Sequence, residues 1–202
     1  MRFQASLGIV LLFISLYHPV CRSDNIESYA TQLLASAREY LLFWRSGNAD
    51  TTFITNQRCV ELSYIIFDDT SDIVTLDARG NKEREWDPKL FKATINSTKK
   101  NIIRYAPLEV EGDAGAVSVY YRILHYYKDH CYIAQMIHHE GEATFEPGII
   151  RSCEFWVKKE DIISTNINHI TRKAKMCKPV VDKLCYSGMQ IYTHKQCRER
   201  QR

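Results

Sequence analysis

Residues 116–138 read AVSVYYRILHYYKDHCYIAQMIH, and this stretch predicts the fold. It contains two strand-sized runs rich in tyrosine, valine and isoleucine, residue types that favour β-strands. The polar residues Lys128, Asp129 and His130 separate the runs and predict a tight turn between them. We therefore expect an antiparallel hairpin of two strands, residues 116–127 and 131–138.

Similar apolar runs on both sides of this hairpin predict six more strands. They are residues 39–45, 59–67, 73–78, 89–95, 101–105 and 150–158. Eight strands in chain order predict an antiparallel up-and-down barrel, because closure leaves no unpaired edge. Apolar residues at steps of three and four predict a short N-terminal helix over 24–37, capped by Asp24. The same spacing predicts a helix over 168–185 packed on the outside of the barrel, with Pro179 ending or kinking it.

The N-terminus has the pattern of a signal peptide. Residues 7–17 are apolar but too few to span a bilayer, and Cys21 and Ser23 are small residues placed for cleavage before Asp24. We therefore expect residues 1–23 to be removed and residues 24–202 to form one secreted domain. The sequon Asn96-Ser97-Thr98 predicts a glycan at Asn96 on an exposed segment.

Loss of Cys21 leaves an even number of cysteines, which predicts three disulfides in a secreted chain. They are Cys59, Cys131, Cys153, Cys177, Cys185 and Cys197. No pair has metal-binding Cys-x-x-Cys spacing, and no catalytic or phosphate-binding motif occurs, so no metal, cofactor or enzymatic activity is expected. The net charge is +3 with scattered basic residues, and no second long apolar run occurs, so neither nucleic acid nor a membrane is an expected partner. We expect a monomer.

Cys59 opens a predicted strand, Cys131 follows the tyrosine-rich strand, and the motif Cys153-Glu154-Phe155-Trp156-Val157 lies on the last strand. With three further cysteines near the C-terminus, residues 40–197 resemble the tick salivary histamine-binding lipocalins. The Gly-x-Trp signature of vertebrate lipocalins is absent at Phe43-Trp44-Arg45. The resemblance implies an eight-stranded lipocalin barrel with the disulfides Cys59–Cys197 and Cys131–Cys177, which leaves Cys153 for Cys185.

Strand alternation then predicts which side chains face the barrel interior. Neighbouring residues of a strand point to opposite faces, so an outward Cys153 places Glu154 and Trp156 inside. The same alternation, counted from the presumed disulfides, predicts two further sets of inward residues. These are Tyr120, Arg122, Leu124 and Tyr126 on one strand and Tyr132, Ala134 and Met136 on the next.

The resemblance also implies the ligand chemistry. A protonated amine leaves water at a high cost unless a carboxylate meets it, and aromatic faces add cation–π attraction. By resemblance, Glu154 is the pocket carboxylate and Asp50 with Phe53 an acid-plus-aromatic loop element. Aromatic faces would come from Tyr120 and Trp156, whereas Tyr132, also predicted to face inward, stands where the family can place another acid. The function so implied is sequestration of a host amine, histamine or serotonin, which blunts inflammation and helps the tick evade host defence.

Arg122 leaves two alternatives open. It stands where a second acid of the family would align, and residues 88–105 contain no acid. Arg122 would either pair with Glu154 or anchor the carboxylate of a fatty acid or leukotriene held in the same barrel. A third possibility is a modulator of a host immune or complement component that acts through its outer surface.

Overall fold

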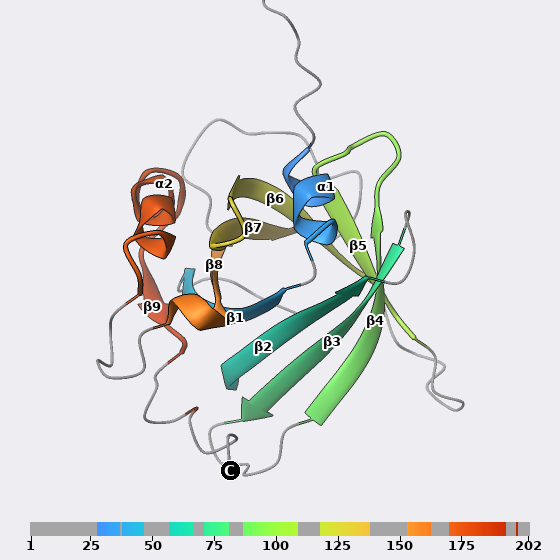
Figure 1. Ribbon diagram of the computed structural model, residues 1–202, viewed down its shortest axis with the longest axis horizontal. Coiled ribbons are helices and arrows are strands. Elements are labelled where there is room, and N and C mark those ends of the chain that lie inside the picture. Colours follow the sequence, from blue (N-terminus) through green and yellow to red (C-terminus); the bar gives the residue numbers. More distant parts are fainter. Residues whose placement is uncertain are drawn as a thin grey trace, which may run out of the picture.

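The computed structural model describes residues 28–36, 38–46, 57–66, 71–80, 87–108, 118–137, 153–162, 170–192 and 197. Nine strands and two short α-helices occur in this part of the chain (Figure 1). The helices are α1 (Tyr29–Leu34) and α2 (Lys178–Leu184), and two 3₁₀ turns are η2 (Lys159–Asp161) and η3 (Ala174–Cys177). The strands are β1 (Glu39–Ser46), β2 (Gln57–Ile66), β3 (Ser71–Gly80), β4 (Asp87–Ile95), β5 (Ile102–Pro107), β6 (Val119–Tyr127), β7 (Cys131–Ile137), β8 (Cys153–Lys158) and β9 (Gly188–Gln190).

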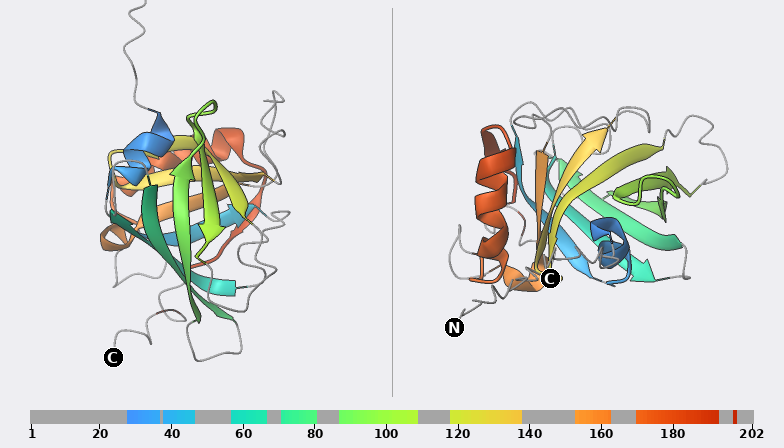
Figure 2. Two further views of the ribbon diagram at one scale, coloured as in Figure 1. Left: turned by 90° about the vertical axis from the view of Figure 1, so that its right-hand side faces the viewer. Right: turned by 90° about the horizontal axis from the view of Figure 1, so that it is seen from above.

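The first eight strands close into a barrel. Each strand from β2 to β7 pairs antiparallel with the next, β8 pairs with β1, and Glu39, Tyr40 and Leu41 of β1 pair back onto β2. After Leu41, the edge of β1 is taken over by β9, which pairs with residues 44–46. The predicted antiparallel up-and-down barrel is confirmed, and Figure 2 shows its strands curled around a common interior.

Helix α1 packs across one end of the barrel. Its apolar residues Ala30, Leu33 and Leu34 join the apolar cluster that fills the interior. The N-cap is Ser28, whose Oγ accepts a hydrogen bond from the backbone N–H of Thr31. The expected cap, Asp24, was therefore wrong, because the helix begins four residues later than its apolar spacing suggested. Ser28 also ties α1 to the β4–β5 turn, donating a hydrogen bond to the carbonyl of Lys100.

The C-terminal segment forms an outer layer against β6, β7 and β8 (Figure 2). Ala174, Cys177 and Val181 are buried there in a second apolar cluster. The long helix expected over 168–185 was wrong in length, since α2 has seven residues and follows the 3₁₀ turn η3. Pro179 lies in the first turn of α2, where its missing N–H breaks no helical hydrogen bond.

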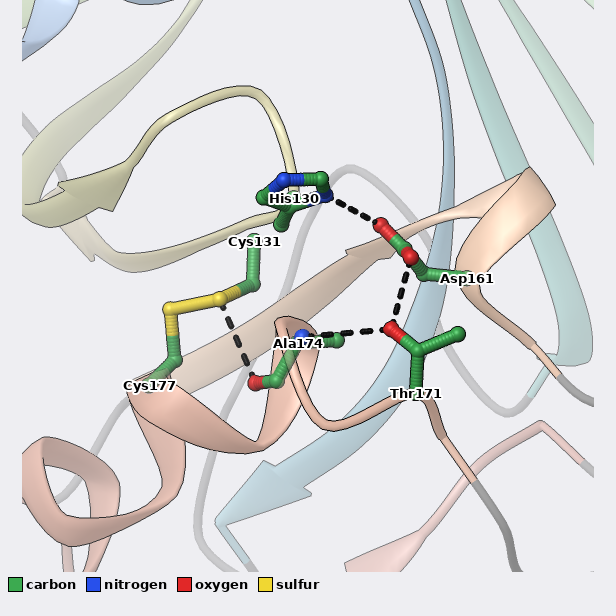
Figure 3. The surroundings of a disulfide bond; sticks show 6 residues. All are labelled: His130, Cys131, Asp161, Thr171, Ala174 and Cys177. Carbon is green, nitrogen blue, oxygen red and sulfur yellow. Dashed lines mark hydrogen bonds and ion pairs between the residues drawn. A yellow bond between two sulfur atoms is a disulfide. The ribbon is translucent and has the colours of Figure 1, made fainter.

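Three disulfides fasten this layer and the C-terminus to the barrel: Cys59–Cys197, Cys131–Cys177 and Cys153–Cys185. They join the same pairs that the family resemblance implied. A polar cluster lies beside the second disulfide (Figure 3). There the His130 Nδ1 lies 2.7 Å from the Asp161 Oδ2, and Thr171 donates a 2.6 Å hydrogen bond to the other carboxylate oxygen of Asp161. These bonds hold the β6–β7 turn to the start of the outer layer.

Candidate ligand-binding site

The side chains of β8 show which residues face the interior of the barrel. Trp156 belongs to the apolar cluster inside the barrel, whereas Cys153 and Phe155 belong to the cluster under the outer layer. Glu154, between Cys153 and Phe155, is therefore on the inner face and is fully buried. On β7, Tyr132 faces inward with Trp156, and the two rings stack with their planes 5° apart.

A bulge in β6 reverses the alternation of this strand. Ile123 and His125 pair with consecutive residues of β7, which leaves Leu124 as an extra residue. On the C-terminal side of the bulge, Tyr126 faces the interior. On its N-terminal side, Tyr121 and Ile123 face inward instead of their even-numbered neighbours.

A second bulge lies in β1. Leu42 and Trp44 pair with consecutive residues of β8, so Phe43 is the extra residue. The bulge places Arg45 directly opposite Glu154 in the β1–β8 ladder. Arg45 is buried, so β1 brings a positive charge to the interior. The other residues that β1 contributes to the inner cluster are Tyr40 and Leu42.

Aromatic rings dominate the lining of the interior. The cavity between them has a volume of about 10 Å³, room for about one water. Edge-to-face contacts join Tyr105 to Tyr121 and Tyr40 to Tyr132. The residues around the cavity are Leu62, Tyr105, Tyr121, Ile123, Tyr132, Ala134 and Trp156.

Glu154 connects this aromatic lining to Arg45. The Trp156 Nε1 donates a 3.1 Å hydrogen bond to the Glu154 Oε2, and the Arg45 Nη2 lies 3.3 Å from the Glu154 Oε1. Arg45 is the next-to-last residue of β1 and Glu154 the second of β8. In an up-and-down barrel, this is the end opposite the β4–β5 turn that holds α1. The ion pair therefore lies at the end of the barrel away from the helix.

Burial controls the protonation of this group. Removal from water raises the pKa of the Glu154 carboxyl above its ordinary value. The positive charge of Arg45 and the hydrogen bond from Trp156 act in the opposite direction without cancelling the effect of burial. Burial also raises the pKa of the nearby Tyr121 hydroxyl, which stays protonated beside the carboxylate.

Comparisons with known proteins agree with this architecture. The family model described as "Tick histamine binding protein" matches residues 23–200. The chain belongs to the tick histamine-binding protein family. No curated protein sequence matches it, but a solved structure does, that of Japanin from Rhipicephalus appendiculatus bound to cholesterol. The two share 14% identity over 80% of this chain and 96% of Japanin, with a TM-score of 0.52, and this likeness shows the fold. The family is one of binding proteins, so the chain is a ligand-binding lipocalin and not an enzyme.

Three predicted site residues come together in this member of the tick histamine-binding family. Tyr132, Glu154 and Trp156 lie side by side on the inner faces of β7 and β8. Asp50 and Phe53 lie outside the residues that the structure describes.

The expected inward facing of Tyr120, Arg122 and Leu124 was wrong. The Leu124 bulge shifts the alternation by one residue, so Tyr120 and Arg122 are on the outer face, and Leu124 packs against the cluster under the outer layer. The Arg122 Nη1 donates a 3.4 Å hydrogen bond to the Gln135 Oε1 of the neighbouring strand. Arg122 therefore neither pairs with Glu154 nor reaches a ligand inside the barrel.

Sequence reasoning missed Arg45, Tyr121 and Tyr105 as residues of the interior. Arg45 carried a signal, because it is the only charged residue in the apolar run 40–46. Its inward facing was hidden by the bulge at Phe43, which strand alternation cannot reveal. For Tyr121 the obstacle was the bulge at Leu124.

The remaining expectations concern the surface. Asn96 lies in the exposed β4–β5 turn, where its Oδ1 accepts hydrogen bonds from Thr98 and Lys99. Its glycosylation stays a prediction. Among the described residues, no group of three His, Cys, Asp or Glu side chains is arranged to hold a metal ion. None of the described helices is long and apolar enough to cross a membrane.

Proposed function

We propose that the protein is a secreted trap for a host biogenic amine, histamine or serotonin, and that Glu154 is the carboxylate that meets the ammonium group. The observation that carries this proposal is a fully buried acid on the inner face of the barrel, hydrogen-bonded to Trp156 and close to Tyr121. Among the side chains that the structure describes, Glu154 is the only acid on the inner face of the barrel.

The chemistry of the interior supports an aromatic cation as ligand. Tyr105, Tyr121, Tyr132 and Trp156 line the cavity, and Trp156 also donates a hydrogen bond to Glu154. Because the cavity has room for about one water, an amine would enter by moving these side chains apart. A cation over such a ring gains roughly 0.5 to 2 kcal/mol, and the carboxylate offsets the cost of removing the ammonium from water. The name of the family, tick histamine-binding protein, agrees with this ligand class.

A neutral lipid with one polar group is the second candidate. Arg45 already balances the charge of Glu154, so an uncharged ligand would bind without leaving a net charge in the interior. Japanin, which shares the fold, is described as bound to cholesterol. The carboxylate lipid that Arg122 would have anchored loses its support, because Arg122 is on the outer face.

Calorimetric titration of histamine, serotonin, cholesterol and one eicosanoid tests the proposal. If the ligand is an amine, Glu154→Gln should weaken its binding by roughly 2 to 5 kcal/mol, the effect of removing one partner of a buried charged pair. Glu160→Gln, which removes an exposed acid paired with Lys158, is the control and should leave affinity unchanged. Glu154→Gln leaves the buried charge of Arg45 uncompensated. If that variant does not fold, the double variant Arg45→Gln/Glu154→Gln, which removes both buried charges, takes its place.

Two results would contradict the amine-binding hypothesis. Unchanged amine affinity in Glu154→Gln would show that Glu154 is not the counter-ion. Binding of cholesterol without binding of either amine would favour the neutral lipid. If none of the four ligands binds the wild-type protein, both pocket proposals fail, and action on a host immune or complement component through the outer surface becomes the leading hypothesis.

A further inference from the structure

Arg45 is held in place from both sides of β1. On one side it pairs with Glu154 of β8, and on the other with Met189 of β9. Gly188 of β9 packs so closely on β1 that a Cβ atom there would collide with the Arg45 carbonyl. The backbone of Arg45 is therefore fixed, and its side chain begins from a defined point opposite the carboxylate.

Three polar groups act on the Glu154 carboxylate from the elements packed around it. They are the guanidinium of Arg45 from β1, the hydroxyl of Tyr121 from β6 and the indole N–H of Trp156 from β8. On β7, the residue directly opposite is Ala134, which carries no polar side chain. Among the described residues, Arg45 is thus the cation that compensates Glu154.

The two partners differ in their access to solvent. The Glu154 side chain is fully buried, whereas the Arg45 side chain keeps 9% of its surface exposed. Arg45 is also next to the end of its strand. The Nε and Nη2 atoms of Arg45 are buried in this arrangement, but its long, flexible side chain can move toward solvent more readily than the short, fully buried side chain of Glu154.

We propose that Arg45 takes the place of the ligand cation: it pairs with the Glu154 carboxylate until a protonated amine binds and displaces it. This inference rests on the proposed amine-binding function and adds a residue that sets its affinity. Two cations cannot share one buried carboxylate without an uncompensated charge, so the ammonium and the guanidinium compete. Arg45 therefore lowers amine affinity and favours ligands whose aromatic contacts compensate for its displacement.

Removing the competitor tests the idea directly. At pH 8, Arg45→Gln should bind histamine at least about tenfold more tightly than wild type, which corresponds to about 1.4 kcal/mol. Arg45→Lys keeps the charge and should stay close to the wild-type affinity. Arg122→Gln is the matched control, because it removes the same charge from the outer face of the barrel and should change nothing.

Proton release provides a second readout that a purely structural role would not change. Without Arg45, the pKa of Glu154 rises further, because the guanidinium is the largest influence that lowers it. Amine binding to Arg45→Gln should therefore release more protons than binding to wild type. Titration in buffers of different ionisation enthalpy measures this difference. If Arg45→Gln does not fold, Arg45→Met, which keeps a similar apolar stem, takes its place.

The outcomes separate this inference from the function on which it rests. If wild type binds an amine and Arg45→Gln binds no more tightly, the inference fails and the function stands. If only the Arg45→Gln variant binds, Arg45 blocks the carboxylate without giving it up, so displacement of Arg45 and amine capture by the natural protein are both wrong. If neither binds at pH 8, both are wrong.

Discussion

At the scale of single residues, the interior contains a charged pair where an apolar barrel core was possible. Burying Arg45 and Glu154 costs several kcal/mol per ion, and their attraction only partly repays it. Replacing such pairs with apolar residues is often neutral or stabilising. The pair is therefore poorly explained as a source of stability. Its place on the inner face, next to the aromatic side chains of Trp156 and Tyr121, fits recognition of a charged ligand.

The raised pKa of Glu154 predicts how stability changes with pH. The unfolded chain ionises this carboxyl at its ordinary pKa, whereas the folded chain keeps it protonated to a higher pH. The folded state therefore binds more protons in this window, and the free energy of unfolding falls as pH rises through it. Glu154→Gln does not titrate, so its stability deficit relative to wild type should shrink from pH 4 upward.

Urea denaturation of wild type and Glu154→Gln at pH 4, 5, 6 and 7 measures this trend. Asp182→Asn, which changes an exposed acid on α2, provides the control for general charge effects. A deficit that grows with pH would mean that Glu154 is ionised more easily in the folded protein than in the unfolded chain.

At the scale of elements, two bulges decide which side chains enter the barrel. Each adds one residue to a strand, and one residue is enough to exchange the two faces of everything beyond it. In β6 the bulge brings Tyr121 inside and turns Arg122 out, and in β1 it brings Arg45 inside. The electrostatics of the interior thus depend on two irregular positions, Leu124 and Phe43.

Neighbouring substitutions in β6 test this facing. Ile123→Ala should lower the free energy of unfolding by roughly 2 to 5 kcal/mol, because it opens a cavity in the inner cluster. Arg122→Ala should cost about 1 kcal/mol or less, since it removes a partly exposed polar contact. Equilibrium urea unfolding compares the two. A larger loss for Arg122→Ala would mean that β6 has no bulge and that the even-numbered residues face inward.

At the scale of the whole molecule, the disulfides connect the outer layer and the C-terminus to the barrel. Cys153 is the residue next to Glu154, so the bridge to Cys185 also anchors the start of the strand that carries the site. The bridge from Cys59 to Cys197 closes a much longer stretch of chain, 138 residues against 32. Cys59–Cys197 therefore mainly restrains the unfolded chain, whereas Cys153–Cys185 also restrains the strand that carries the site.

Paired replacement of these cysteines by alanine should separate the two effects. Loss of Cys59–Cys197 is expected to cost about 1 kcal/mol more stability than loss of Cys153–Cys185, because the entropy of loop closure grows with the logarithm of loop length. Ligand affinity should fall mainly in the variant that lacks Cys153–Cys185. Thermal unfolding and calorimetry measure both quantities, and equal effects on affinity would contradict a specific role for the bridge beside Glu154.

The sequence by itself determined the barrel and much of its covalent frame. The strand-sized runs, the turn at Lys128–His130 and the cysteine count depend on short-range chemistry, which is visible in a linear chain. Strand alternation also placed Glu154 and Trp156 inside correctly, because β8 is regular between Cys153 and Val157.

Only the tertiary structure decided which charge accompanies Glu154. The bulges at Phe43 and Leu124 follow from how adjacent strands align, and their residues have no composition that marks them. A bulge depends on the register between two paired strands, whether they are neighbours in the chain, as β6 and β7 are, or far apart, as β1 and β8 are. The residues of one strand alone therefore do not reveal it. For this reason the sequence pointed to Arg122 as the partner cation, whereas the folded barrel brings Arg45 to the carboxylate.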